Sequence, residues 1–217
     1  MSSIYEELRE AAELAAAPRR SPARPLIRVD LSTSSIAAEA DRLWEALEPL
    51  AAAHDAELMR VGTLGLSWLE PVVEVERPDL SAAASGGGAV VYGPVRPEDA
   101  ADFLTAALGD NPAEDAAGWL IGARTASAGI APLSAHPFWG PQERRLMRVM
   151  GVIDPESLDE AIAEGAYEAL DRAVTMEPMA ICDLVLAAGV GGRGGGGFPA
   201  GQKWKFLLGA PGPTKYL

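Results

Sequence analysis

Residues 26–50 read LIRVDLSTSSIAAEADRLWEALEPL, and this stretch predicts a β-strand followed by an α-helix. Polar and apolar side chains alternate from Leu26 to Leu31, which is the period of a half-buried strand. Apolar side chains then recur at helical intervals and share one face: Ile36, Ala40, Leu43, Leu47 and Leu50. The stretch therefore predicts a β-α unit that opens a folded α/β domain.

Short runs rich in β-branched residues follow, and each predicts a strand. They lie at residues 58–61, 72–75 and 89–92. A helix is predicted from Pro97 to Leu108, because proline is favoured in the first helical turn. The predicted order over residues 26–108 is β-α-β-β-β-α. The sequence SAAASGGG at 81–88 predicts a flexible connection between the last two strands.

Residues 1–25 predict a short N-terminal helix and a linker. The helix is expected over residues 3–16, because Ser3 and Glu6 have the spacing of a capping box. Prolines at 18, 22 and 25 predict the end of the helix and an irregular linker after it.

Residues 109–140 predict an interdomain segment, because they are rich in Gly, Pro, Ala and Asp and show no sustained period. We expect this segment to pack on its neighbours through Trp119, Phe138 and Trp139. A second domain is predicted over residues 141–217. Its expected helices are 142–150, a stretch from an N-cap at Asp154 to Val174 that bends near Gly165, and Pro178–Ala188.

Composition limits the partners and the compartment. The 217 residues suffice for two small domains, and the net charge of −13 with a pI near 4.6 excludes nucleic acid as a favoured partner. The single cysteine, Cys182, is expected to be a buried helix residue, so thiolates of this chain cannot complete an iron–sulfur site. With no basic N-terminal leader and no long apolar run, we expect a cytoplasmic protein, peripheral to a membrane at most.

A glycine-rich stretch, AGVGGRGGGGFPAGQKWKF at residues 188–206, carries the main functional signal. Main-chain amides that no Cβ shields can approach phosphates and flat rings closely, and Arg193, Lys203 and Lys205 supply positive charge. A flexible linker is the alternative interpretation of a glycine run. The particular sequence FPAGQKWKF that follows favours a binding loop.

Two common nucleotide-binding patterns fit this stretch poorly. Gly192, Gly194 and Gly197 match G-x-G-x-x-G, but Pro199 and Gly201 stand where that pattern needs a helix. The P-loop pattern is excluded, because no Gly-Lys pair followed by Ser or Thr is present.

The stretch resembles the flavoprotein subunit of respiratory complex I and its relatives in NAD-linked formate dehydrogenases and NAD-reducing hydrogenases. The loop of that family reads S-G-L-R-G-R-G-G-A-G-F-P-T-G-x-K-W. Eleven residues agree in register: Gly189, Gly192, Arg193, Gly194, Gly195, Gly197, Phe198, Pro199, Gly201, Lys203 and Trp204. Five depart: Ala188, Val190, Gly191, Gly196 and Ala200. The resemblance implies an NADH:acceptor oxidoreductase subunit that passes electrons from NADH to FMN and works with other subunits.

The resemblance also implies the site residues for FMN and NAD(H). Residues 192–197 would line the FMN and nicotinamide pocket, Lys203 would lie by the flavin phosphate, and Phe198 with Phe206 would stack on adenine. Glycine at 191, where the family has arginine, removes one cation. The full predicted cofactor-binding set is Gly192, Arg193, Gly194, Gly195, Gly196, Gly197, Phe198, Gly201, Lys203 and Phe206, and no catalytic or metal-binding residue is predicted.

Residues 26–108 resemble the thioredoxin-like ferredoxin domain that precedes the flavin domain in the formate dehydrogenase and hydrogenase versions. The resemblance rests on three stretches: LSTSSIAAEA, VGTLGLSWLEPVVEVE and VVYGPVRPEDAADFL. Thr63 and Ser67 stand at the family's C-x-x-x-C pair, and Ser34 and Ser35 stand in its other cysteine-bearing stretch. Because hydroxyls do not replace thiolates, we expect no iron–sulfur cluster here and predict that these side chains hydrogen-bond the former ligand loops.

The family continues beyond the equivalent of Leu217 with a second flavin loop and a cysteine-rich cluster motif. This chain therefore resembles the N-terminal part of such a protein, with an incomplete FMN-binding α/β domain, and we expect it to be inactive in isolation. The alternative is a degenerate, non-catalytic scaffold or assembly subunit. His54 is expected to face solvent and His136 to serve in packing.

Overall fold

A computed structural model describes residues 4–80, 88–125, 129–212 and 214 of the chain. Two compact units make up the chain, Met1–Glu164 and Gly165–Leu217. The sequence instead predicts a boundary near residue 140. Of the predicted connection at 81–88, all but Gly88 lies outside the described residues.

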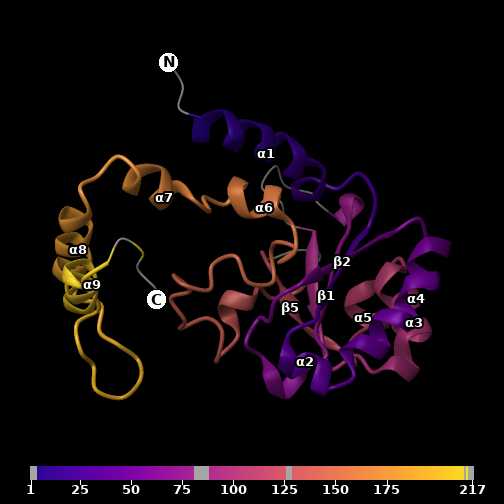
Figure 1. The fold of residues 1–217 in the computed structure, drawn as a ribbon. Coiled ribbons are helices and arrows are strands. Elements are labelled where there is room, and N and C mark those ends of the chain that lie inside the picture. Colours follow the sequence, from indigo (N-terminus) through magenta and orange to yellow (C-terminus); the bar gives the residue numbers. More distant parts are fainter. Residues whose placement is uncertain (1–3, 81–87, 126–128, 213, 215–217) are drawn as a thin grey trace. The chain divides into compact units, whose positions relative to one another are not determined.

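The first unit is built on a five-stranded mixed sheet with strand order β2-β1-β3-β4-β5 (Figure 1). The strands are β1 (Leu26–Asp30), β2 (Glu57–Val61), β3 (Val73–Glu76), β4 (Ala89–Tyr92) and β5 (Leu120–Ala123). Strand β1 pairs parallel with β2 and antiparallel with β3, and the remaining pairs are antiparallel. The predicted α/β class is confirmed.

Helices α3 (Ala40–Ala53) and α4 (Ala100–Leu108) cover one face of this sheet (Figure 1). Alternate residues of β1 meet them, because successive side chains of a strand point to opposite faces. The main core of this face includes Ile27, Val29, Leu43, Leu47, Val73, Val75, Val90, Tyr92, Phe103 and Leu104. Burial of these apolar side chains is the principal stabilising contribution in this unit.

The opposite face of the sheet carries buried charge. Arg28 pairs with Glu74 and Glu76, both at 2.8 Å, and Arg124 pairs with Glu74 at 2.5 Å. Each carboxylate is close to a guanidinium, as buried charges require. The side chains of β1 therefore face an apolar core on one side and an ion-pair network on the other.

The helix predicted over residues 36–50 is divided into two. A short helix α2 (Thr33–Ala37) begins earlier, and Ser32 caps it by accepting from the Ser35 amide. Glu39 has a left-handed conformation with φ of 69°, and α3 starts after it. An apolar period alone does not show this break, because it depends on a hydroxyl cap and one backbone rotation.

The predicted interdomain segment contains part of the sheet. Helix α5 (Pro112–Asp115) and β5 lie within it, and β5 pairs with β4. Trp119 packs edge-on against Phe103 with ring centroids 5.7 Å apart, and Phe138 packs against Trp68 at 4.6 Å. Trp139 packs against a smaller core formed by Leu64, Leu66, Val72, Val91 and Leu133. Strand β5 has four residues, which are too few to show an alternation of polar and apolar side chains in the sequence.

The N-terminal helix is longer than predicted. Helix α1 (Ile4–Arg20) passes through Pro18, so the prediction that this proline ends the helix is wrong. Pro18 lies in the last turn, where its missing N–H removes one backbone bond and little helix follows it. The extra turn places Arg19 and Arg20 on the helix.

The prediction of a helix over 142–150 is also wrong, because that stretch forms turns. Arg144 there donates to the Leu64 carbonyl at 2.9 Å, and its guanidinium lies 3.9 Å from the centre of the Trp139 ring. Helix α6 (Leu158–Ala163) follows with Ser157 as its N-cap, where the sequence predicts Asp154.

The described part of the second unit, residues 165–212 and 214, contains three helices. They are α7 (Glu168–Ala173), α8 (Pro178–Ala187) and α9 (Ala200–Gly209). Gly165 has a φ of 92°, which accounts for the predicted bend ahead of α7. Helix α9 corrects the expectation that Pro199 and Gly201 exclude a helix after the glycines. Pro199 is the N-cap of α9, and Gly201 lies against α8.

Candidate functional site

The glycine-rich loop between α8 and α9 is closed at its base by backbone hydrogen bonds. The Gly192 amide donates to the Phe198 carbonyl at 2.7 Å, and the Ala200 amide donates to the Val190 carbonyl at 2.8 Å. Gly191 and Pro199 form an antiparallel bridge between these two bonds. The loop is therefore a short hairpin with a paired neck, which a freely flexible linker would not have.

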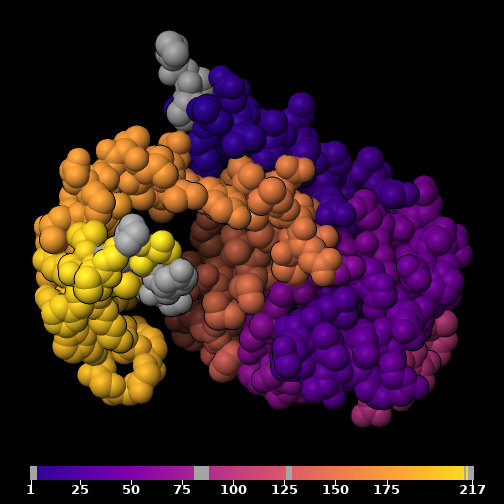
Figure 2. Space-filling model, in the orientation of Figure 1, coloured from indigo at the N-terminus to yellow at the C-terminus, as the bar shows by residue number. Residues whose placement is uncertain are grey.

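The tip of this hairpin is open. Residues 193–197 are exposed, and a Cβ built at Gly194, Gly195, Gly196 or Gly197 would meet no atom within 4 Å. Gly195 and Gly197 have φ values of 112° and 62°, so glycine suits both positions. In Figure 2 the tip projects from α8 and α9 as a lobe. Its main-chain amides are accessible to a ligand.

One predicted cation lies directly at the neck. A Cβ at Gly192 would be 2.8 Å from Lys203 Nζ, so glycine at 192 leaves the ammonium close to the loop backbone. Lys205 is not available in the same way, because its Nζ pairs with Asp183 at 2.5 Å. Arg193 is exposed at the tip. Within the described residues, Lys203 and Arg193 make no ion pair.

The close approach of α9 to α8 fixes where Lys203 lies. A Cβ at Gly201 would lie 2.4 Å from the Leu186 nitrogen and 2.6 Å from its Cα. Real Cβ atoms do not approach backbone so closely, so a residue with a side chain would push the helices apart. Gly201 is thus required by packing between helices and lies away from the open tip.

Phe198 and Phe206 form an exposed aromatic pair. Their ring centroids are 6.2 Å apart with an interplanar angle of 33°, and the residues are 45% and 62% exposed. The structure therefore places four of the predicted site residues close together two by two, Gly192 beside Lys203 and Phe198 beside Phe206. Exposed aromatic faces can accept a flat ring by stacking.

A second polar cluster joins helix α2 to the segment between β2 and β3. Glu70 Oε1 accepts from the Ser34 hydroxyl at 3.0 Å and from the Thr63 hydroxyl at 3.1 Å. The Gly65 amide donates to Thr63 Oγ1 at 2.9 Å. The predicted hydrogen bonding of these segments is present, but Glu70 at its centre was not predicted. Its position before Pro71 and a strand gave no signal of this role.

The other residues singled out from the sequence are exposed, buried or engaged in local hydrogen bonds. Ser67 is exposed, whereas Ser35 is fully buried and its hydroxyl has no partner in the described residues. Cys182 is buried in α8 and His54 is exposed, as predicted. His136 Nδ1 accepts from the Phe138 and Trp139 amides.

Two other kinds of feature are absent from the described part of the chain. In residues 4–80, 88–125 and 129–212, three or more His, Cys, Asp or Glu side chains never gather as they would around a metal ion. None of the described helices has both the length and the apolar character that crossing a membrane needs.

Comparison with known proteins gives partial matches. No known family profile matches the chain. The HndC component of the NADP-reducing hydrogenase of Solidesulfovibrio fructosivorans is 47% identical over 76 residues, which cover 35% of this chain and 16% of that protein. The F component of the NADH-quinone oxidoreductase of Aquifex aeolicus is 46% identical over 61 residues, or 28% of this chain and 14% of that protein. The F 2 component of the Rhizobium meliloti enzyme of the same name is 42% identical over 73 residues, or 33% and 17%.

These matches span about a sixth of the length of each relative. They confirm the resemblance predicted from the glycine-rich stretch, for part of the chain. Over about a third of its length, this chain is a homologue of the F components of NADH-quinone oxidoreductases and of a component of an NADP-reducing hydrogenase.

Proposed function

We propose that the glycine hairpin and α9 form part of a binding site for FMN and NADH in a subunit of an NADH-linked oxidoreductase. The observation that carries the proposal is the paired neck at Gly192, with Lys203 Nζ beside it and an open tip beyond. The names of the relatives support the same interpretation, because they are NADH- or NADP-linked redox subunits.

The hairpin suits a phosphate group. Consecutive amides at the tip can donate to phosphate oxygens without interference from Cβ atoms. Lys203 at the neck and Arg193 at the tip add positive charge in a chain with a net charge of −13. A phosphate contact with an ammonium is a charge-assisted hydrogen bond, roughly twice as strong as a neutral one.

The aromatic pair suits a flat ring. Phe198 belongs to the neck of the hairpin and Phe206 to α9, so both lie on the elements that hold Lys203. In the proposed site, the two rings take the adenine of NADH while the hairpin takes the flavin. Bound FMN would accept a hydride from NADH and release electrons singly, and the chain's own residues would bind and orient the two cofactors.

The proposal extends to the first unit. The strand order β2-β1-β3-β4, with α3 and α4 on one face, supports a thioredoxin-like domain over residues 26–108. The bonds from Ser34 and Thr63 to Glu70 support a structural role in place of cluster ligation. Because the relatives are named as subunits, we also propose assembly with other subunits of a larger oxidoreductase.

Titration of the purified chain with FMN tests the proposal, with quenching of flavin fluorescence as the readout. Lys203→Gln is expected to weaken FMN binding about tenfold or more, because a hydrogen bond to a charged group contributes about 1.5–3 kcal/mol. Lys205→Gln is the matched control: its ammonium is two residues away on the same helix but is paired with Asp183. Its affinity is expected to stay within about twofold of the unchanged chain.

Two results would contradict the proposal. If the Lys203→Gln and Lys205→Gln variants bind FMN with equal affinity, Lys203 at the neck of the hairpin does not bind the flavin phosphate. If neither FMN nor NADH binds the chain at millimolar concentration, the alternative of a non-catalytic scaffold gains support. Redox turnover is a separate matter, because the matched segments span only about a sixth of each relative.

A further inference from the structure

Helix α1 packs on α6 through small side chains. Ala12 and Ala16 of α1 are buried against Ala163 of α6, with Ile162 partly buried beside them. The larger apolar side chains of α1 point outward: Ile4, Leu8 and Leu14 are 79%, 53% and 78% exposed. Figure 2 shows the indigo atoms of α1 at the surface, against the orange atoms of α6. Apolar burial therefore contributes little to this contact.

Ion pairs at the end of α1 also attach this helix to the rest of the first unit. Arg19 Nη1 lies 2.6 Å from Glu160 Oε1, and Arg19 Nε lies 3.0 Å from Glu57 Oε1 on β2. Arg20 pairs with Glu164 at 2.7 Å. These two arginines thus link α1 both to the sheet and to the last residues of the first unit.

Glu160 is the centre of this attachment. It is 6% exposed, and its second oxygen accepts from the Asp154 amide at 2.8 Å. Asp154 Oδ2 also lies 3.6 Å from Arg19 Nη1. One carboxylate therefore fixes α1 and the turn before α6 together. Its hydrogen bond raises the pKa of the Arg19 guanidinium above its ordinary value.

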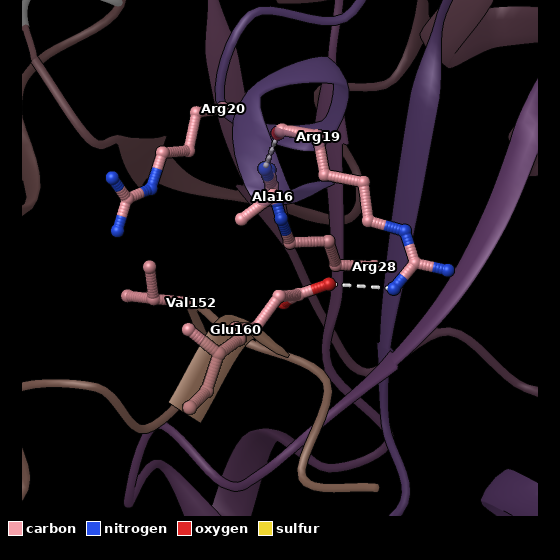
Figure 3. Close-up of a pocket in the computed structure, with 7 residues that line it drawn as sticks. Ala16, Arg19, Arg20, Arg28, Val152 and Glu160 are labelled. Carbon is pink, nitrogen blue, oxygen red and sulfur yellow. Dashed lines mark hydrogen bonds and ion pairs between the residues drawn. The ribbon is translucent and has the colours of Figure 1, made fainter. Parts of the chain in front are cut away.

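A polar recess lies under the attachment. Its cavity volume is about 50 Å³, and it is lined by Ala16, Arg19, Arg20, Arg28, Val152, Ile153 and Glu160 (Figure 3). Arg28 Nε is buried without a partner in the described residues, and Arg28 Nη2 donates to the Arg19 carbonyl at 3.4 Å. Because each arginine of the recess already has a carboxylate, the recess is not an anion site. It is a small, incompletely packed space that is partly open to solvent.

We propose that α1 is a strap fastened by charge, which holds residues 152–164 near the β2 edge of the sheet and releases them when its ion pairs are screened. Residue 164 leads directly to Gly165, the first residue of the unit that carries the glycine hairpin. Interactions between exposed charges reach about 10 Å at 0.1 M salt and about 3 Å at 1 M, so added salt weakens chiefly the more exposed pairs, Arg19–Glu57 and Arg20–Glu164. The strap is therefore a device that responds to ionic strength.

Amide hydrogen exchange of the 217-residue chain, read by mass spectrometry, tests the proposal. Arg19→Gln is expected to raise exchange about tenfold in residues 4–20 and 152–164 together, with no change in β1 or β3. Arg9→Gln is the matched control, since among the described residues the ion pair of Arg9 lies within α1, with Glu13. In the unchanged chain, salt raised from about 0.1 to 1 M is expected to give the same paired increase.

Three outcomes would overturn the proposal. Residues 152–164 could keep their protection while residues 4–20 lose it, which would make α1 a passive appendage. The strands could lose protection as well, which would make Arg19 a general stabilising residue. High salt could leave both segments unchanged. If Arg19→Gln does not fold, Arg20→Gln and the salt series on the unchanged chain give the same readouts.

Discussion

Replacement of Gly201 by alanine tests the packing that positions the candidate site. The added Cβ would lie 2.4 Å from the Leu186 nitrogen, 2.6 Å from its Cα and 2.7 Å from its Cβ. Ordinary contact needs about 3.4 Å, so α9 must move by about 1 Å from α8. The obstructing atoms are mostly backbone, so a change of side-chain rotamer cannot relieve the overlap.

The cost follows from the size of this overlap. Overpacking with one methyl group costs about 1–3 kcal/mol when backbone has to shift. The higher helix propensity of alanine returns less than about 1 kcal/mol, because residue 201 lies in the first turn of α9. We therefore expect the free energy that holds α9 on α8 to fall by about 1–2 kcal/mol. This is roughly a fivefold to thirtyfold rise in the open population.

Hydrogen exchange in the peptides of α8 and α9 measures this population directly. Gly209→Ala is the matched control: it lies at the end of the same helix, and its Cβ would meet no atom within 4 Å. In Gly201→Ala, protection from amide exchange is expected to fall in both α8 and α9. In Gly209→Ala, it is expected to stay equal or rise slightly. Equal protection in the two variants would refute the argument that packing against Leu186 requires glycine.

Two further predictions concern the first unit. Glu70→Ala removes the acceptor shared by Ser34 and Thr63 and is expected to lower the free energy of unfolding in urea by about 1–3 kcal/mol. Ser67→Ala, at an exposed position, is the control and is expected to change the free energy of unfolding by less than about 0.5 kcal/mol. Equal effects of the two substitutions would contradict the role of Glu70 as a bridge between Ser34 and Thr63. Burial raises the pKa of Tyr92 from 10.0 to about 12, so the unfolded chain loses this proton first as the pH rises. The contribution of Tyr92 to the free energy of unfolding is fully present below pH 10, and about 2–3 kcal/mol of it is lost towards pH 12. Tyr92→Phe is expected to remove this part of the pH dependence. If the free energy of unfolding of the variant falls with pH as steeply as that of the unchanged chain, the assignment to Tyr92 is wrong.

Most of the sheet could be predicted from the sequence, because its strands have strong local signals. The strand predicted at residues 89–92 has the same bounds as β4, and β1 lies within the strand predicted at residues 26–31. Strand β5 was missed because its four residues lie among glycines and alanines with no period of their own. It exists through pairing with β4, which is a tertiary interaction.

The helix after the glycines was missed for a different reason. Pro199 and Gly201 are helix breakers by propensity, yet proline is compatible with a helix start and Gly201 is demanded by its contact with Leu186. Glu70 was missed because it meets Ser34 across 36 positions of sequence. Lys205 was predicted to serve the basic spot, but Asp183 neutralises it. Each of these depends on contacts that no local pattern encodes.

In the proposed site, the paired neck of the hairpin would matter more to binding than the number of glycines. A free run of glycines loses more conformational entropy on ordering than other residues do. The bonds at residues 190–192 and 198–200 already fix both sides of the loop, so a ligand has only residues 193–197 left to order. The same neck carries Phe198 and lies beside Lys203, so ring, cation and amides are held together before a ligand arrives. Affinity in the proposed site therefore depends on the glycines at two levels: those at the tip admit the ligand, and Gly192 and Gly201 place the groups that hold it.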